Sequence, residues 1–335
     1  MTILNIITNE SVSKKDEKYS CDNIDLKSIP ESLSQYTQVK LIGRKSKIQR
    51  NKEIHIDNFS IHGNIFSYLF AIIKKKEKQK DKYLIISISP YTFLACIVLS
   101  IFKVKPYVYL RSDGYKEYKS ILGFYGPFLY HVMFSLVAKS SFLISCREHI
   151  LKKKEGIVVS PSQLNDNWFS NQKKLAFDKI KLLYVGRIRI EKGIFSLAKI
   201  LEKTDYNLTV VTSSLTKNIN KFSKNIKVID FKNNNDEIIK IYDEHNIFIL
   251  PSFTEGHPQV LDEALARWRP VIVFNEISHV VRERKGVFVT ERNIESLKET
   301  INHISSNFEK IQEDIKKNSL PTKKSFIQEL KTIMF

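Results

Sequence analysis

Short apolar runs alternate with amphipathic helical patterns along most of this chain. Runs of the length of buried strands occupy residues 3–8, 39–42, 84–88, 107–110, 142–144 and 157–159 in the first half, and 182–185, 208–212, 226–229, 247–250, 271–274 and 287–289 in the second. Helical periodicity lies between several of them, at 64–76, 92–102, 127–139, 194–203, 237–244, 258–267 and 294–308. Strands that alternate with helices predict parallel sheets covered on both faces.

Two such series, each of ordinary domain length, predict an α/β protein with two Rossmann-like domains whose parallel sheets face each other across a cleft. The segment 160–174 is rich in Asn and Ser and contains Pro161, so it is a poor helix or strand and marks the boundary. We expect an N-terminal domain at 1–165, a C-terminal domain at 166–318, and a C-terminal helix at 319–335 that returns toward the first domain.

Two uncharged stretches, 83–102 and 121–138, are long enough to cross a bilayer by length alone. Pro90 breaks the first into a strand, a turn and a helix, and Gly123, Gly126 and Pro127 interrupt the second. A globular interpretation of both stretches is therefore favoured. Three distant cysteines (Cys21, Cys96 and Cys146) and an N-terminus without a signal-peptide pattern predict a reducing, cytoplasmic location.

The formal net charge of the 335 residues is +18, and it is concentrated in the first half. Residues 1–165 carry 26 Lys and Arg against 14 Asp and Glu, a balance of +12. Such a surface favours nucleic acid, anionic lipid or a phosphorylated substrate, and the charge alone does not choose among them. A compositional bias toward Lys, Asn and Ile, as in an AT-rich coding sequence, accounts for the charge equally well.

The first motif with chemical content is the segment 182–193, which reads LLYVGRIRIEKG. An apolar strand ends at Gly186, and Arg187 and Lys192 lie in the loop before a helix that begins near residue 194. Two cations beside a helix N-terminus suit a diphosphate, because fixed charge and unpaired backbone N–H groups act together. A solvated basic loop explains these residues equally well.

The second motif is the segment 247–266, which reads IFILPSFTEGHPQVLDEALA. A strand again leads into a loop, and Pro258 fits the first position of the following helix. Glu255 in the loop and Glu263 in the helix place carboxylates at two levels, where they can accept hydrogen bonds from hydroxyls on two parts of one ligand. The apolar residues around Glu263 restrict the helix orientation, whereas Asp262 is interpreted as a solvated neighbour.

Together the two motifs resemble the C-terminal half of the family 4 glycosyltransferases, also called glycosyl transferases group 1. The resemblance implies the GT-B fold, a nucleotide-sugar donor, retention of anomeric configuration and no bound metal or other cofactor. It also implies roles for the residues of the donor site. Arg187 and Lys192 stabilise the leaving diphosphate, Glu255 and the backbone of Gly256 and His257 face the transferred sugar, and Glu263 binds the ribose; Gly186 and Pro258 complete the site.

The first half departs from the family pattern. The loop after the first strand, 8–15, contains no glycine where members often have a Gly-rich loop. After the strand at 107–110, Arg111 and Asp113 occupy the place where many members have a histidine. We hypothesise that Asp113 orients or deprotonates the acceptor hydroxyl, and a turn-capping role is the alternative. In the second half, Arg267-Trp268-Arg269 replaces a small-residue turn.

The sequence thus predicts a hexosyltransferase-type enzyme of cell-envelope polysaccharide assembly that acts on a glycan or lipid-linked acceptor. A nucleotide-sugar epimerase of the same fold and a basic nucleic-acid-binding protein are the alternatives. No nucleic-acid module is recognisable, so nucleic acid is not the expected partner. The basic first half, the lysine run at 74–82 and the aromatic stretch 121–138 further predict peripheral attachment to the inner face of an anionic membrane.

Overall fold

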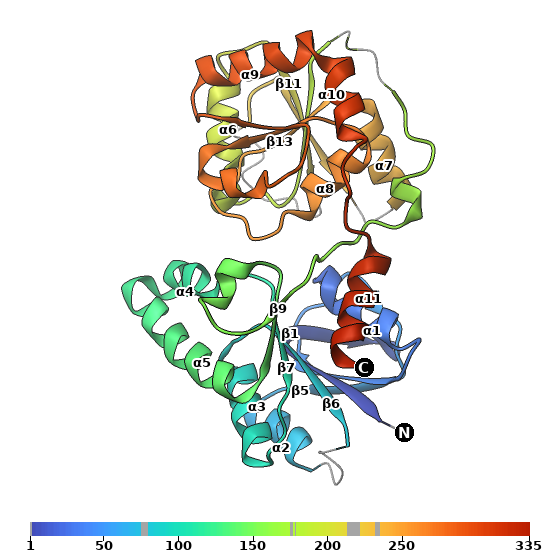
Figure 1. Cartoon of the computed structure of the whole chain (residues 1–335), viewed down its shortest axis with the longest axis vertical. Helices are drawn as coiled ribbons and strands as arrows, with labels where there is room; N and C mark the ends of the chain where they lie inside the picture. Colours follow the sequence, from blue (N-terminus) through green and yellow to red (C-terminus); the bar gives the residue numbers. More distant parts are fainter. Residues whose placement is uncertain (1, 75–79, 175–176, 178, 213–221, 232–234) are drawn as a thin grey trace. The chain divides into compact units, whose positions relative to one another are not determined.

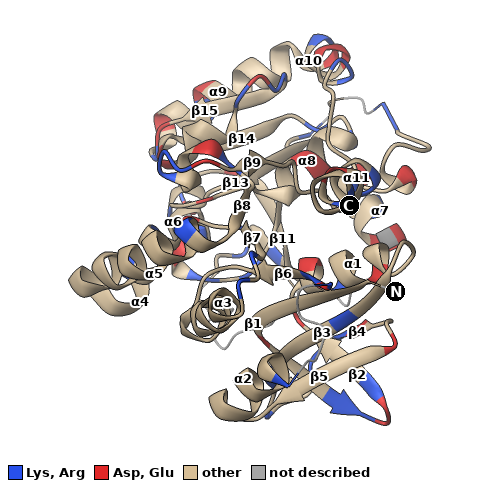
Figure 2. Cartoon of the chain, turned by 60° about the horizontal axis from the view of Figure 1, so that its bottom comes forward, with Lys and Arg blue, Asp and Glu red and all other residues tan. Residues whose placement is uncertain are grey.

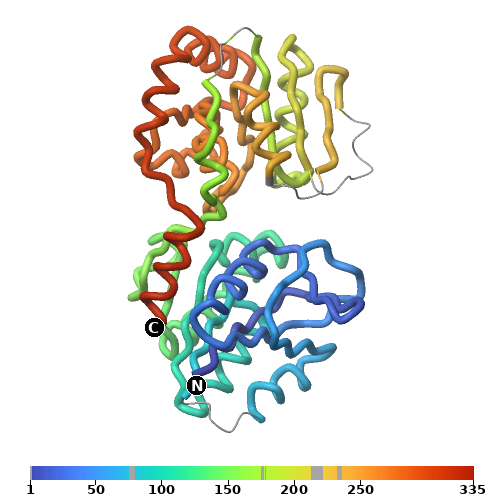
Figure 3. Tube along the Cα trace, turned by 90° about the vertical axis from the view of Figure 1, so that its right-hand side faces the viewer, coloured from blue at the N-terminus to red at the C-terminus, as the bar shows by residue number. Residues whose placement is uncertain are grey.

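The computed structural model describes residues 2–74, 80–174, 177, 179–212, 222–231 and 235–335. The chain divides into two compact units, one formed by Met1–Ser160 with Lys324–Phe335 and the other by Pro161–Lys323. The division falls at the start of the segment 160–174, and the C-terminal helix belongs to the same unit as the N-terminus, as the two ends of the tube in Figure 3 show. Of the lysine run at 74–82, residues 75–79 lie outside the described residues.

The N-terminal unit is built on a parallel sheet in the order β5-β3-β1-β6-β7-β8-β9, and antiparallel strands β2 and β4 extend it at one end of β1. The strands are β1 (Ile3–Lys15), β2 (Lys18–Cys21), β3 (Gln38–Lys45), β4 (Lys52–Ile54), β5 (Asn58–His62), β6 (Lys82–Ile86), β7 (Tyr107–Leu110), β8 (Phe142–Ser145) and β9 (Ile157–Val158). The helices are α1 (Ile24–Leu33), α2 (Ile65–Ile73), α3 (Pro90–Ile101), α4 (Gly114–Leu122), α5 (Gly126–Ser140) and α11 (Lys323–Met334).

Alternation along the strands sorts side chains onto two covered faces of this sheet. Leu4 and Ile6 share a buried cluster with Leu26 of α1 and Phe326 of α11, whereas Ile7 lies in the cluster that contains α2, α3 and α5. Figure 1 shows the same two layers, with α1 and α11 on one side of the strands and α2, α3 and α5 on the other. Both faces are apolar because helices exclude water from both.

Local sequence signals explain where several helices begin. Ser89 and Thr92 form a capping box around Pro90, which stands in the first turn of α3. Asn23 and Asn64 accept hydrogen bonds from the first turns of α1 and α2. The break of the stretch 83–102 at Pro90 is therefore correct, because β6 ends before it and α3 starts at it.

The C-terminal unit contains one parallel sheet in the order β12-β11-β10-β13-β14-β15. Its strands are β10 (Lys181–Val185), β11 (Asn207–Thr212), β12 (Ile226–Asp230), β13 (Ile247–Leu250), β14 (Val271–Phe274) and β15 (Val287–Thr290). Its helices are α6 (Ile194–Leu201), α7 (Asn235–Glu244), α8 (Gln259–Ala266), α9 (Ile294–Ser306) and α10 (Phe308–Ile315). The strand order reverses between β10 and β13, which defines a doubly wound sheet and its ligand-binding edge.

The predicted α/β class with two Rossmann-like domains is confirmed, and the errors are local. β1 runs on past residue 8 to Lys15 through a register shift, and β2, β4 and β5 were not predicted, because they are short or half-exposed and lack an apolar run. Helices α1, α4 and α10 were also missed. Pro258 is not the first helical residue of α8; it precedes the helix in an extended conformation.

A buried ionic network holds the segment after Pro161 against α7 and α8. Arg267 donates from Nε and Nη2 to the two carboxylate oxygens of Asp243, at 2.9 and 2.7 Å. It also donates to the backbone carbonyls of Trp168, Ser170 and Asn171, and its side chain is 1% exposed. Arg269, equally buried, contacts the same carboxylate at 3.3 Å. The departure at 267–269 is therefore a structural clamp.

Replacement of Asp243 by Ala should strongly destabilise the C-terminal unit. Both guanidinium groups would remain buried without their counter-charge, and breaking a buried pair in this way costs about 3–5 kcal/mol. The free energy of unfolding can be measured in urea by tryptophan fluorescence, since both tryptophans, Trp168 and Trp268, lie in this unit. Glu313→Ala, which removes an exposed pair with Lys316, is the control and should leave the midpoint unchanged. A midpoint for Asp243→Ala equal to that of the control would contradict the clamp.

Candidate functional site

The two sequence motifs meet at the carboxyl edge of the C-terminal sheet, where the strand order reverses between β10 and β13. Lys192 of the loop after β10 forms an ion pair with Glu255 of the loop after β13, with 2.7 Å between Nζ and Oε1. The Ser252 hydroxyl donates to the same carboxylate oxygen at 2.7 Å, and the Phe253 N–H donates to the Glu191 carbonyl at 3.0 Å. Residues 63 positions apart in the chain thus form one site.

Gly193 allows the two loops to approach this closely. Its φ is +67°, a left-handed conformation that favours glycine, and a Cβ at this position would lie 1.8 Å from the Pro251 carbonyl oxygen. No side chain fits there without moving one loop. Gly193 was not among the predicted site residues, although it is part of the Lys-Gly pair that ends the first motif.

The site presents positive potential from side chains and from backbone. Arg187 is exposed, and the Lys192 side chain is 22% exposed, so both are accessible to a ligand. Helices α6 and α8 begin directly after these loops, and neither has a side-chain hydrogen-bond cap among the described residues. Unpaired N–H groups at helix N-termini, together with a guanidinium and an ammonium group, suit a diphosphate.

Glu263 lies one to two turns into α8, and its carboxylate accepts a hydrogen bond from the Tyr242 hydroxyl at 2.9 Å. Burial raises the pKa of Glu263 to about 7 from its usual 4.5; the hydrogen bond from Tyr242 opposes this rise, and the neighbouring Asp262 carboxylate adds to it. Such a carboxyl group changes charge near neutral pH. Hydroxyl groups that donate to it would favour the ionised form.

The interpretation of Asp262 as a solvated residue is wrong. Its side chain is 2% exposed, and it accepts two hydrogen bonds from Arg284, at 2.8 and 3.0 Å. The His257 ring is 3% exposed and lies 3.2 Å from the same carboxylate. His257 therefore packs its side chain inward, so that its backbone, beside Gly256, is the part of this residue left for a ligand.

Arg292, just after β15, is a residue that the sequence analysis missed. Its guanidinium lies over the rings of Phe253 and Phe274, at 4.2 and 4.3 Å from their centroids, and donates to the Pro251 carbonyl at 2.9 Å. Its ion pair with Glu276, at 2.7 Å, lowers the pKa of that carboxyl group. Arg292 thus supports the loop after β13. Arg292 could have been predicted from its position, because it follows the carboxyl end of a strand in the same sheet.

Asp113 is the one predicted site residue in the N-terminal unit. It precedes α4, accepts a hydrogen bond from the Tyr115 N–H at 3.1 Å and lies 3.3 Å from the Lys152 ammonium. The hydrogen bond from Tyr115 makes Asp113 the N-cap of α4, whereas the alternative expected from the sequence was a turn cap. Arg111, two residues earlier, forms an ion pair with Glu10 at 3.0 Å and lies 3.7 Å from Asp25. The strands β1 and β7 therefore bring a charged cluster to the same edge.

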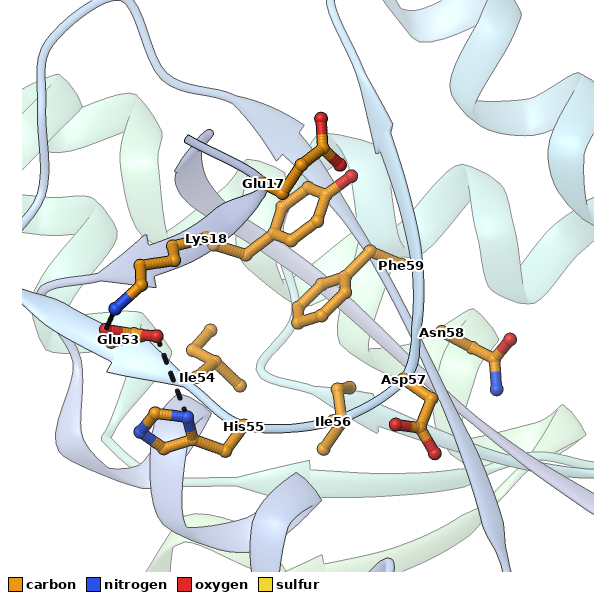
Figure 4. A pocket seen from close by; sticks show the side chains of 10 residues that line it. Glu17, Lys18, Glu53, Ile54, His55, Ile56, Asp57, Asn58 and Phe59 are labelled. Carbon is orange, nitrogen blue, oxygen red and sulfur yellow. Dashed lines mark hydrogen bonds and ion pairs between the residues drawn. The ribbon is translucent and has the colours of Figure 1, made fainter. Parts of the chain in front are cut away.

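A cavity of about 610 Å³ in the N-terminal unit contains none of the predicted residues. Its lining comes from β2, β4 and the segment that enters β5 (Figure 4). It includes the stacked rings of Tyr19 and Phe59, whose centroids lie 3.9 Å apart. Glu53 forms an ion pair with Lys18 at 3.2 Å along its wall. We assign no role to this cavity.

The fold defines an α/β protein of two Rossmann-like units, and comparisons with known proteins specify its class. The sucrose-phosphate synthase of Thermosynechococcus elongatus superimposes with a TM-score of 0.70 over 99% of this chain and 98% of that one, at 14% identity. The predicted GT-B fold is therefore confirmed. Residues 166–320, the larger part of the C-terminal unit, match the model of the family described as glycosyl transferases group 1.

Two curated relatives carry biosynthetic names. The chain is 34% identical to the capsular polysaccharide biosynthesis glycosyltransferase CapM of Staphylococcus aureus, over 44% of this chain and 46% of that protein. It is 26% identical to the putative teichuronic acid biosynthesis glycosyltransferase TuaC of Bacillus subtilis, over 44% and 39%. The matches thus span less than half the length of each relative.

Binding of a nucleotide sugar at about pH 7 should release protons from Glu263. If Glu263 binds a ribose, hydroxyls that donate to its carboxylate would lower its pKa, so ionisation would accompany binding. Calorimetry at this pH in two buffers of different ionisation enthalpy measures the release, which should reach a sizeable fraction of one proton and vanish in Glu263→Gln. The exposed Glu244→Gln is the matched control. Equal release in all three proteins would exclude Glu263 from the ribose site.

Proposed function

We propose that this protein is a retaining glycosyltransferase that transfers a sugar from a nucleotide donor to a glycan or lipid-linked acceptor. The observation that carries the proposal is the 2.7 Å pair of Lys192 and Glu255 at the edge where the strand order reverses. It joins the two family motifs into one site, and Arg187 is exposed in the same loop as Lys192. The names of the relatives support an acceptor of cell-envelope polysaccharide assembly.

In the proposed reaction the bond between the anomeric carbon and the diphosphate oxygen breaks, and the acceptor oxygen forms a bond to that carbon on the same face. Negative charge develops on the leaving diphosphate. Arg187, Lys192 and the N–H groups at the start of α6 would stabilise this charge, so the proposal needs no divalent ion. The acceptor proton goes to the departing phosphate or to a carboxylate, for which Asp113 is our candidate.

The remaining residues would fix the donor. Glu255, held by Lys192 and Ser252, accepts hydrogen bonds from hydroxyls of the transferred sugar. Glu263 binds the ribose, and the backbone at Gly256 and His257 lies between the two carboxylates in the chain. Gly186 directly follows β10, and Pro258 directly precedes α8, so they mark where the first loop begins and where the second loop ends. A thermal-shift panel of UDP, GDP, ADP and their sugars identifies the nucleotide, because a ligand that binds only the folded state raises its melting temperature.

Replacement of Lys192 or Arg187 by Ala should reduce the rate of transfer about 10²–10³-fold, because each change removes a partner of the developing charge. The rate is measured with the identified donor, in EDTA, and the fold is monitored by thermal unfolding. Lys199→Ala, an exposed lysine on α6, is the control and should keep normal turnover. Near-normal turnover of both site variants would contradict the proposal that Arg187 and Lys192 stabilise the leaving diphosphate. Activity that appears only after Mg²⁺ or Mn²⁺ is added would contradict the proposal that these two cations replace a metal ion.

Replacement of Asp113 by Asn separates its two proposed roles. Asn retains the ability to cap α4 but cannot accept a proton, so the variant should stay folded, bind nucleotide normally and lose transfer to the acceptor by about 10²-fold or more. Hydrolysis of the donor by water, measured in the same reactions, should change less than transfer does. Unchanged transfer would leave helix capping as the whole role of Asp113.

A further inference from the structure

The stretch Gly114–Ser140 is the only helical stretch of the described residues that is long and apolar enough to cross a membrane, and less than a third of its most apolar part is buried. It does not form one straight helix. The rings of Tyr115 and Tyr130 lie 4.9 Å apart, and the Tyr115 hydroxyl contacts His131 Nδ1 at 2.9 Å. Residues 15 positions apart in a continuous helix would be separated by about 22 Å. The stretch is therefore a hairpin of α4 and α5.

Two glycines make this hairpin. Gly123 has a φ of +60°, which ends α4 in a conformation that other residues rarely adopt. At Gly126 a Cβ would lie 2.0 Å from the Tyr118 carbonyl oxygen, so α5 can start against α4 only with glycine there. The glycines that interrupt the stretch 121–138 in the sequence thus form the turn between α4 and α5.

The turn of the hairpin exposes an apolar surface, which we name the apolar tip. Phe124 is 89% exposed, Tyr125 78% and Phe128 73%. The other members of the apolar tip are Ile121, Leu122 and Leu129, which are also exposed. No charged residue occurs from 120 to 138, and the protruding ends of α4 and α5 are tan in Figure 2. Such a concentration of large exposed apolar side chains marks an interaction surface.

Aromatic residues on the same hairpin behave differently when they face the sheet. Tyr130 is 3% exposed and Phe134 is 1% exposed, both in the core cluster of α2, α3 and α5. The core is therefore complete without the apolar tip. Phe124, Tyr125 and Phe128 are therefore not needed to fill the core of this unit.

Charges around the apolar tip identify its occupant. Lys116 and Lys119 on α4 are exposed, and Glu117 is the one acidic residue of the two helices; the exposed Lys139 lies at the end of α5 that is distant from the tip. A second copy of this chain in a symmetric contact would bring the same lysines toward one another, which is unfavourable. An anionic bilayer accepts aromatic side chains among its head groups and attracts lysines.

We propose that the α4–α5 hairpin inserts its apolar tip into the interface of an anionic membrane, without crossing it. The aromatic side chains enter the head-group region, and Lys116 and Lys119 meet the lipid phosphates. The proposal does not depend on the sugar-transfer activity, because the donor site lies in the other unit. Nucleotide binding therefore reports separately on the donor site.

Co-sedimentation of the full chain with vesicles tests the insertion. Binding should occur with vesicles of phosphatidylcholine and phosphatidylglycerol, fade as salt rises and be weak with phosphatidylcholine alone. Phe124→Ser/Phe128→Ser should lower the partition coefficient at least about tenfold, since both side chains leave the interface. Tyr36→Ser/Ile48→Ser, which alters exposed apolar residues outside the hairpin, is the matched control and should bind like the unmodified chain. Equal losses in both double variants would overturn the proposal.

Two further measurements separate insertion from other interactions. Lys116→Gln/Lys119→Gln should weaken binding to anionic vesicles about fivefold per lysine. The fluorescence of Tyr125→Trp should be quenched by spin-labelled lipid, whereas that of the unmodified chain should not. Binding without this quenching would show adsorption at the surface and overturn insertion. If no vesicles bind and Phe124→Ser/Phe128→Ser instead converts a dimer to a monomer in sedimentation velocity, the apolar tip is a contact between copies.

Discussion

The ion pair of Lys192 and Glu255 depends on a property of parallel sheets: the carboxyl ends of all strands reach the same edge. In this sheet the reversal between β10 and β13 leaves their two loops next to each other, and the left-handed Gly193 lets the loops touch. Each partner lowers the cost of burying the other, and Ser252 binds the carboxylate further. This contact therefore holds together the two loops that lead into α6 and α8.

The surroundings of that site are stabilised by charges that are buried in pairs. Asp243 is shared by Arg267 and Arg269, and Asp262 is bound by Arg284 at the base of α8. Each guanidinium also donates to backbone carbonyls, so its loss of hydration is compensated by several directed hydrogen bonds. These arginines restrict the position of α7 and α8, which carry Tyr242 and Glu263. The arginine–aspartate pairs therefore hold Tyr242 and Glu263 in place through the helices that carry them.

The two units present different physical surfaces. The edge of the C-terminal sheet is polar and cationic, and it suits a phosphorylated donor. The α4–α5 hairpin of the N-terminal unit is apolar at its turn and basic beside it, and it suits a lipid interface. If the acceptor is lipid-linked, attachment through the hairpin raises the local concentration of the acceptor at the enzyme. The separation lets each surface be altered without direct change to the other.

The sequence alone determined the alternation of strands and helices, the two Rossmann-like units and the two motifs of the donor site, because buried strands, glycines and charged loop residues have strong local patterns. Short half-exposed strands such as β4 have no such pattern, so they could not be predicted from the sequence. Tertiary structure alone decided which charges are paired: Asp262 looked like a surface residue and is buried against Arg284, while Arg292 supports a loop 41 residues away. It also decided which aromatics of the hairpin are core and which are exposed. Burial and pairing depend on residues distant in the chain, and no local pattern contains them.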